Sequence, residues 1–249
     1  MKDHEIYSGL ITTVPFVLRL DGRSFHHFSR DQGFEKPYDP QFSKAMAQTT
    51  ASLLSDSGLA PSFAYTFSDE ISLYIATPVF DCRVEKLVSV AAGFASSAFT
   101  LHAGADSPLS FDCRVVPLAE FQLPKYLAWR QAEAWRNHMN GYAHKLLTDT
   151  GLSATVAQRK LDGMKASELH ELAFSFGVNL SETPAWQRRG TAVYRTLVER
   201  DGYNPMTKET VRVLRRTITI DEDLPLFKTP EGAAWLAERI AVPLADVRS

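Results

Sequence analysis

Two short acidic motifs have the residue types and spacing needed for chemistry. Asp21-Gly22 follows an apolar run at residues 15–20, and Ser68-Asp69-Glu70 separates two runs rich in strand-forming residues. Two carboxylates held close together repel each other, and a divalent cation removes that conflict. Mg²⁺ prefers hard oxygen ligands, usually one or two carboxylates together with water and substrate phosphates. The motifs therefore predict a magnesium site for phosphoryl transfer, with Asp21 and Asp69 as ligands.

Gly22 suits such a site because a residue without a side chain lets a phosphate or a metal approach the backbone. Its carbonyl oxygen could act as a third ligand. Taken alone, each motif is better explained as a turn after a strand or as the tip of a hairpin. A fold that brings together two aspartates 48 positions apart favours the metal site instead. The sequence contains no Walker A motif, dinucleotide fingerprint or nucleophile elbow that would support another mechanism.

The elements that must position these acids follow from the hydrophobic pattern. Strands are predicted at residues 15–20, 63–67, 71–75 and 111–116, helices at 40–57 and 83–101, and a loop at 23–39. This order is the βαββαβ split unit of ferredoxin-like folds, which is also the carboxylate-bearing core of polymerase palms and nucleotide cyclases. Right-handed crossovers place the first strand antiparallel to the third, so Asp21 should meet Asp69.

The fold class is therefore α+β, with a palm-like catalytic core at residues 1–120. Residues 121–249 should form an extension packed on that core as one compact unit. The pattern predicts a long helix at 124–148, helical structure at 153–175, a strand at 190–198 with a hairpin partner at 209–220, and a short helix at 230–240.

Bulk composition constrains location and partners. A net charge of −2 gives no general affinity for polyanions, so an RNA-binding role would need a local basic surface. The two cysteines, Cys82 and Cys113, are too few for a disulfide framework and lack zinc-ligand spacing. No apolar segment follows the N-terminal residues, and no run of about 20 apolar residues stands out. We expect a cytoplasmic protein without a membrane partner.

Several blocks of sequence, in the right order, resemble the tRNA-His guanylyltransferase family over about residues 1–195, whereas residues after about 200 match poorly. The blocks are Arg19-Leu-Asp-Gly-Arg-Ser-Phe-His26, Phe34-Glu-Lys-Pro-Tyr-Asp39, Phe67-Ser-Asp-Glu-Ile-Ser72, Phe94-Ala-Ser-Ser97, Phe111-Asp-Cys-Arg-Val-Val116, Tyr126-Leu-Ala-Trp-Arg-Gln131 and Arg189-Gly-Thr191.

The resemblance implies an enzyme that adds nucleotides to a tRNA 5′ end in the 3′-to-5′ direction, after ATP or GTP activates that end. It implies two Mg²⁺ ions held by Asp21, the Gly22 carbonyl and Asp69, with Ser68 and Glu70 as catalytic neighbours. Lys36 would assist 5′ activation. The partners implied are tRNA, nucleoside triphosphates and further copies of the chain, in a dimer or tetramer.

Further binding residues are implied by the same resemblance. The backbone of Gly22, Arg23, Ser24, Phe25 and His26 would cradle a triphosphate. Ser68, Arg83, Lys86 and Arg114 would add to nucleotide binding, the three cations as a second phosphate-binding group. Arg136 is a candidate RNA contact on the same ground, and Arg188 and Arg189 are candidate RNA contacts because they form a local basic cluster. For each exposed cation the alternative is a surface salt bridge or a solvated face.

One departure separates this chain from the eukaryotic members. Trp135, His138 and Gly141 stand where those members carry His, Asn and Asn, which favours the guanylyltransferase-like branch that repairs truncated tRNA 5′ ends on the tRNA template. Dedicated guanylate addition to tRNA-His at position −1 stays an alternative. A nucleotide cyclase and a non-catalytic RNA-binding module are rivals from other classes. The sequence leaves open the RNA species, the activating nucleotide, the subunit count and the role of residues 200–249.

Overall fold

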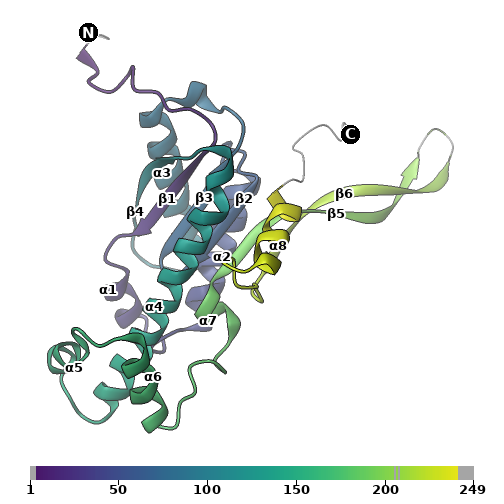
Figure 1. Ribbon diagram of the computed structural model, residues 1–249. Helices are drawn as coiled ribbons and strands as arrows, with labels where there is room; N and C mark the ends of the chain where they lie inside the picture. The colour runs from purple at the N-terminus through teal and green to yellow at the C-terminus, as the bar shows by residue number, and fades with distance from the viewer. Residues whose placement is uncertain (1–3, 205, 207, 241–249) are drawn as a thin grey trace.

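The computed structural model of the chain describes residues 4–240 except 205 and 207. Its centre is a six-stranded sheet in the order β4-β1-β3-β2-β5-β6, with every neighbouring pair antiparallel (Figure 1). The strands are β1 (Phe16–Gly22), β2 (Phe63–Phe67), β3 (Glu70–Ile75), β4 (Phe111–Pro117), β5 (Thr191–Asn204) and β6 (Glu209–Asp221). The order β4-β1-β3-β2 confirms the predicted βαββαβ core, and β5 continues the same sheet from β2.

Helices cover both faces of this sheet (Figure 1). On one face lie α2 (Pro40–Ser55) and α3 (Val84–His102), and on the other lie the long α4 (Leu123–Asp149) and α8 (Pro230–Ile240). The far end of α4 packs with α5 (Ala154–Leu161) and α6 (Ala166–Ser175) around a separate small core. Two short helices, α1 (Phe25–Asp31) and α7 (Ala185–Arg189), and two 3₁₀ turns, η2 (Phe80–Cys82) and η3 (Glu120–Gln122), complete the described elements.

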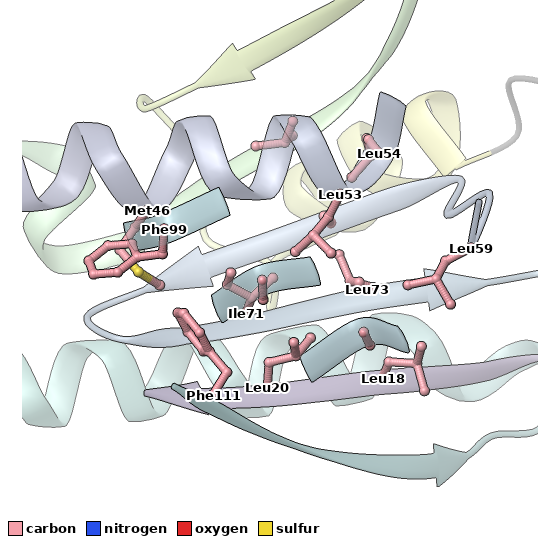
Figure 2. Packing of buried hydrophobic residues seen from close by; sticks show 14 of the residues in the cluster. Leu18, Leu20, Met46, Leu53, Leu54, Leu59, Ile71, Leu73, Phe99 and Phe111 are labelled. Atoms are coloured by element: carbon pink, nitrogen blue, oxygen red, sulfur yellow. The ribbon is translucent and has the colours of Figure 1, made fainter. Parts of the chain in front are cut away.

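The main core lies between the sheet and the pair α2 and α3. Leu18 and Leu20 of β1, with Ile71 and Leu73 of β3, point from the sheet into this layer (Figure 2). Successive side chains of a strand point to opposite faces. Because Leu18 and Leu20 point into the main core, Asp21 lies on the other face, beneath α4. The apolar pattern of β1 thus decides on which side of the sheet its terminal acid emerges.

The predicted loop at residues 23–39 contains a helix, and this part of the prediction was wrong. Phe25 and Phe28 lie three positions apart in α1, and both are buried. The ring of Phe25 stacks on Phe99 at 4.8 Å and meets Phe111 edge-on at 4.9 Å. Seven residues are too few to form a stable helix alone, so this aromatic contact holds α1 in place.

Other helices and strands also differ from their predicted bounds. The predicted helical stretch at 153–175 is two helices, interrupted where Gly163 adopts a left-handed φ of +81°. The strand predicted at 190–198 runs on to Asn204, and α7 was not predicted. Only Thr191–Tyr194 of β5 pairs with β2, so the rest of β5 pairs with β6 alone, as a hairpin that projects from the body (Figure 1).

Helix α3 is long and apolar enough to cross a membrane, judged by length and composition alone, a stretch that did not stand out in the sequence. Its stripe of Leu87, Ala91, Ala95 and Phe99 is buried in the main core. A helix that packs one face against a sheet buries an apolar stripe in this way, and 22% of the apolar stretch of α3 is buried.

Replacing Phe99 by alanine should lower the free energy of unfolding by about 3–5 kcal/mol, because it leaves a large cavity among the rings packed on α3. Phe99 is 0% exposed. Leu101→Ala on the same helix, where the side chain is 81% exposed, is the matched control and should change stability by less than about 1 kcal/mol. Chemical denaturation measures both, and equal losses would contradict the placement of Phe99.

Candidate active site

The two acidic motifs meet at one end of the sheet, as predicted. Asp21 lies opposite Glu70 in the register of β1 and β3. The Gly22 N–H donates to the Asp69 carbonyl oxygen at 3.0 Å, which fastens the end of β1 to the turn between β2 and β3. The local backbone therefore fixes where Asp21 and Asp69 lie relative to each other.

The turn that presents Asp69 is tight. Phe67 pairs with Glu70, so Ser68 and Asp69 alone connect β2 to β3. Ser68 has a φ of 50°, in the left-handed region that a residue with a side chain seldom adopts. Its hydroxyl donates to the Asp69 Oδ1 at 3.1 Å. This hydrogen bond within the turn holds the Asp69 carboxyl at the end of strand β2 and the start of strand β3.

Burial and the neighbouring carboxylate of Asp21, in that order, raise the pKa of Asp69. No described cation forms an ion pair with either acid. A divalent ion suits this environment because it would relieve the repulsion through hard oxygen donors. The described residues contain no group of three or more His, Cys, Asp or Glu that could hold a metal, so an ion would also need backbone carbonyl, water or phosphate ligands.

Glycine is required at position 22 for a reason other than metal access. A Cβ added to Gly22 would come within 2.6 Å of the Phe25 ring, closer than real Cβ contacts. The ring of Phe25 therefore packs where a side chain at position 22 would stand. The Gly22 carbonyl as a metal ligand remains a prediction.

The predicted triphosphate cradle is only partly available. The amides of Gly22 and Arg23 already donate to the carbonyl oxygens of Asp69 and Ser110, at 3.0 and 2.8 Å. Ser24, Phe25 and His26 belong to the start of α1, where the first N–H groups of a helix have no partner within it. Any anion held by backbone amides would therefore bind at these three residues.

A pocket of about 190 Å³ opens beside Asp69. It brings together five of the predicted site residues, Phe25, His26, Lys36, Ser68 and Asp69. Its aromatic and apolar wall was not predicted from the sequence; the wall residues are Phe34, Tyr38, Phe42, Met46 and Trp186. An apolar wall with a few polar groups converging on it is the usual form of a small-molecule site.

Asp39 explains how Lys36 reaches this pocket. Its carboxylate accepts from the Gln41 and Phe42 N–H groups, at 2.7 and 3.1 Å, and so caps α2. The second carboxylate oxygen accepts from the Glu35 N–H at 2.9 Å. One residue, Asp39, thereby fixes both ends of the short turn that carries Lys36.

Glu70 does not turn towards the pocket. Arg130 of α4 donates to both of its carboxylate oxygens, at 2.8 and 2.6 Å, and the two side chains are only 7% and 12% exposed. The guanidinium of Arg130 also lies over the rings of Trp129 and Phe67, at 4.3 and 5.3 Å. The predicted catalytic neighbour is thus committed to a buried ion pair that joins β3 to α4.

The predicted phosphate-binding group of Arg83, Lys86 and Arg114 does not form within one chain. Arg83 bridges to Ile11, before β1 begins, so it and Lys86 lie at the opposite end of β1 from Asp21. That strand spans about 17 Å from its first residue to Asp21. Arg114 lies midway along β4 and donates to Asp112 at 2.7 Å. The loops between strands and helices decide where these three cations lie, and loop sequences have no periodic pattern from which their course can be predicted.

Asp112 was not among the site residues predicted from the sequence. It lies opposite Asp21 in the register of β1 and β4, so Glu70, Asp21 and Asp112 form a row across three strands. The alternation of side chains along the predicted strand at 111–116 could have indicated that Asp112 lies on one face of the sheet.

Among the candidate RNA contacts, Arg136 is exposed and pairs with Glu133, whereas Arg188 and Arg189 line a second pocket.

His138 is a packing residue of α4. It is 0% exposed, its ring stacks on Trp135 at 5.1 Å, and its Nε2 lies 2.8 Å from the Thr183 hydroxyl. Burial, Arg188 and His170 lower the pKa of His138 to about 4. Gly141 lets α4 approach Pro37, where an added Cβ would come within 3.2 Å.

Fold and site together define the class: a palm-like α+β fold with a pair of acids at adjacent strand ends, beside a pocket with the usual form of a small-molecule site. Comparison with known proteins agrees. A family model described as tRNAHis guanylyltransferase matches residues 1–119, and one described as Thg1 C terminal domain matches residues 121–223.

Individual relatives extend the match. A probable tRNA(His) guanylyltransferase of Drosophila melanogaster is 34% identical over 80% of this chain and 73% of its own length. The tRNA(His) guanylyltransferase of Schizosaccharomyces pombe is 30% identical over 88% and 87%. A bacterial tRNA(His) guanylyltransferase (Thg1)-like protein, solved in complex with ATP, shares the fold with a TM-score of 0.73 at 22% identity, over 97% and 98% of the two chains. This chain belongs to the tRNAHis guanylyltransferase family.

Removing one partner of the buried ion pair should destabilise the protein strongly. Arg130→Met should lower the free energy of unfolding by about 3–5 kcal/mol, because it leaves the Glu70 carboxylate buried without its cation. The double variant Arg130→Met with Glu70→Gln should recover part of that loss. Chemical denaturation of Arg130→Met, Glu70→Gln and the double variant measures the coupling, and a loss in the double variant equal to the sum of the two single losses would argue against a direct interaction.

His138 should make stability depend on acid. Unfolded, its pKa lies near 6.5, and folded near 4. The folded state thus takes up the proton only at lower pH, and its contribution to stability is lost as pH falls from about 6.5 to about 4, by roughly 3 kcal/mol. His138→Gln should remove this component, so its stability curve should be flatter over that range. Parallel curves for the two proteins would contradict the prediction.

Proposed function

We propose that this chain is a nucleotidyltransferase that extends or repairs the 5′ end of tRNA in the 3′-to-5′ direction. One observation carries the proposal: the pairing of β1 with β3 holds Asp21 beside Asp69, and Asp69 lines a pocket together with Lys36 and Ser68. A nucleoside triphosphate needs a surface that binds its base and groups that balance the charge of its phosphates. Family membership supports the choice of RNA as acceptor.

The reaction has two steps. The 5′-monophosphate of the RNA attacks the α-phosphate of ATP or GTP, and pyrophosphate leaves. The 3′-hydroxyl of an incoming nucleotide then attacks the activated 5′ phosphate, and the activating nucleoside monophosphate leaves. Two Mg²⁺ ions, when bound, would neutralise phosphoryl oxygens and lower the pKa of the attacking hydroxyl.

The protein's own residues contribute positioning and charge. Asp21 and Asp69 would hold the ions, and the Lys36 ammonium, fixed by the turn that Asp39 clamps, would bind a phosphate oxygen. The aromatic wall of the pocket would take the base and exclude water. Glu70 acts through Arg130 as a positioning residue, since its carboxylate is already engaged.

The repair branch is favoured over dedicated guanylate addition by what replaces the family's His and Asn residues. Trp135 and His138 stack on each other away from the pocket lining, and Gly141 is a contact point for Pro37. None of these side chains lines the pocket, so none offers a hydrogen bond that would select guanine. Base choice would then come from pairing with the tRNA's opposite strand.

The subunit arrangement is part of the proposal. Apolar side chains are exposed along the projecting hairpin, among them Leu197 and Leu214, at 47% and 51%. Apolar surface of this kind supports association with another copy of the chain, as a dimer or a tetramer. We also propose a cytoplasmic location, where tRNA and nucleoside triphosphates are available together.

Asp21→Asn should reduce nucleotide addition to a 5′-shortened tRNA by at least 10³-fold in Mg²⁺, because the ions would lose a ligand, while thermal unfolding changes little. Lys44→Gln, an exposed cation of α2, is the control and should retain activity. Product lengths with each nucleotide, on tRNAs that differ in the opposing base, report whether the template selects it.

Two rivals give different results in the same assay. A nucleotide cyclase would form a cyclic product from labelled GTP without RNA. A non-catalytic binding module would bind tRNA in EDTA as well as in Mg²⁺ and would never lengthen it. Normal addition by Asp21→Asn would reject the proposed site.

A further inference from the structure

A second pocket, of about 250 Å³, lies beside α7 and is lined by charge of one sign. Trp186 and Gln187 of α7 line the pocket at Asp69, whereas the next two residues, Arg188 and Arg189, line this one. Trp135 and Leu226 give it an apolar wall, and Lys228 provides a third cation. We call it the α7 pocket. A single turn of chain therefore separates it from the candidate active site.

The positive charge of the α7 pocket has no counter-ion in the described structure. No acidic side chain lines it, and none of its three cations forms an ion pair with a described residue. Burial, followed by repulsion from Arg189, lowers the pKa of Arg188, and Asp223 opposes this shift without lining the pocket. Like charges held together in this way favour an anion between them.

The two guanidinium groups are already oriented. The Arg188 Nε donates to the Thr183 carbonyl and one terminal nitrogen of Arg189 donates to the Leu224 carbonyl, both at 2.7 Å. A guanidinium has five N–H donors, so each arginine keeps others for a ligand. Planar pairs of such donors match the oxygens of a phosphate group. Anchoring also reduces the side-chain entropy that binding would otherwise remove.

We propose that the α7 pocket binds a phosphate ester, and that this phosphate belongs to the backbone of the RNA whose 5′ end lies at Asp69. The inference rests on the proposed function for its RNA source. The three cations supply the charge, and Trp135 with Leu226 shields it from water. A free nucleoside triphosphate carries the same chemistry, so the experiment separates these two sources.

The test measures the affinity for a 5′-shortened tRNA as a function of salt, using Lys228→Gln and Arg188→Gln in the full-length chain. Each removed phosphate contact should reduce the slope of log K against log salt by about 1, irrespective of RNA sequence. Lys228→Arg keeps the positive charge, so its salt slope should equal that of the unmodified protein. Lys160→Gln, an exposed cation on α5, is the matched control and should bind as the unmodified protein does.

A second arm titrates ATP without RNA by calorimetry. If the phosphate comes from RNA, ATP stoichiometry is the same for the unmodified protein and Lys228→Gln. Loss of one ATP site on Lys228→Gln would overturn the RNA source. Unchanged salt slopes in variants whose thermal unfolding is normal would overturn the pocket itself.

The outcomes also separate the pocket from the proposed function. Unchanged slopes together with an inactive Asp21→Asn would reject only the pocket. Reduced slopes together with normal nucleotide addition by Asp21→Asn would reject only the catalytic assignment.

Discussion

The antiparallel pairing of β1 with β3 is the constraint on which the rest of the site depends. It ends with the Gly22 N–H on the Asp69 carbonyl, and so joins two segments that no local contact would bring together. A shift of one residue would exchange the two faces of β1 and send Asp21 into the apolar core. Burial of Leu18 and Leu20 opposes that shift, so the hydrophobic core secures the geometry of the acids.

The sheet face beneath α4 carries buried polar side chains that are paired with one another. Glu70 is neutralised by Arg130, and Ser72 lies 2.9 Å from the Tyr126 hydroxyl. Buried polar groups without partners would destabilise the fold, so this pairing is what permits charge near the core. Asp21 and Asp69 form no ion pair with a described cation. A bound cation would reduce the repulsion between these two carboxylates.

Helix α7 has only five residues but contributes side chains to two pockets. It forms a wall of the pocket at Asp69 with Trp186 and presents Arg188 and Arg189 to the α7 pocket. Gly190 follows it, and a Cβ there would come within 2.6 Å of the Tyr65 hydroxyl, so β5 can enter the sheet closely only with glycine at this position. Helix α7, which lies within the second matched family segment, therefore contributes residues to both pockets.

The sequence by itself determined the βαββαβ order of the core and the family resemblance, because periodicity and short motifs are local properties. The meeting of Asp21 with Asp69 could be predicted because this order implies an antiparallel pairing of the first strand with the third. Tertiary structure alone decided that Glu70 pairs with Arg130 and that Arg83 and Lys86 lie at the far end of β1. It also decided that α1 is a helix, since its stability comes from Phe99 and Phe111, far along the chain. Such outcomes depend on which surfaces pack together, and no single segment encodes its partner.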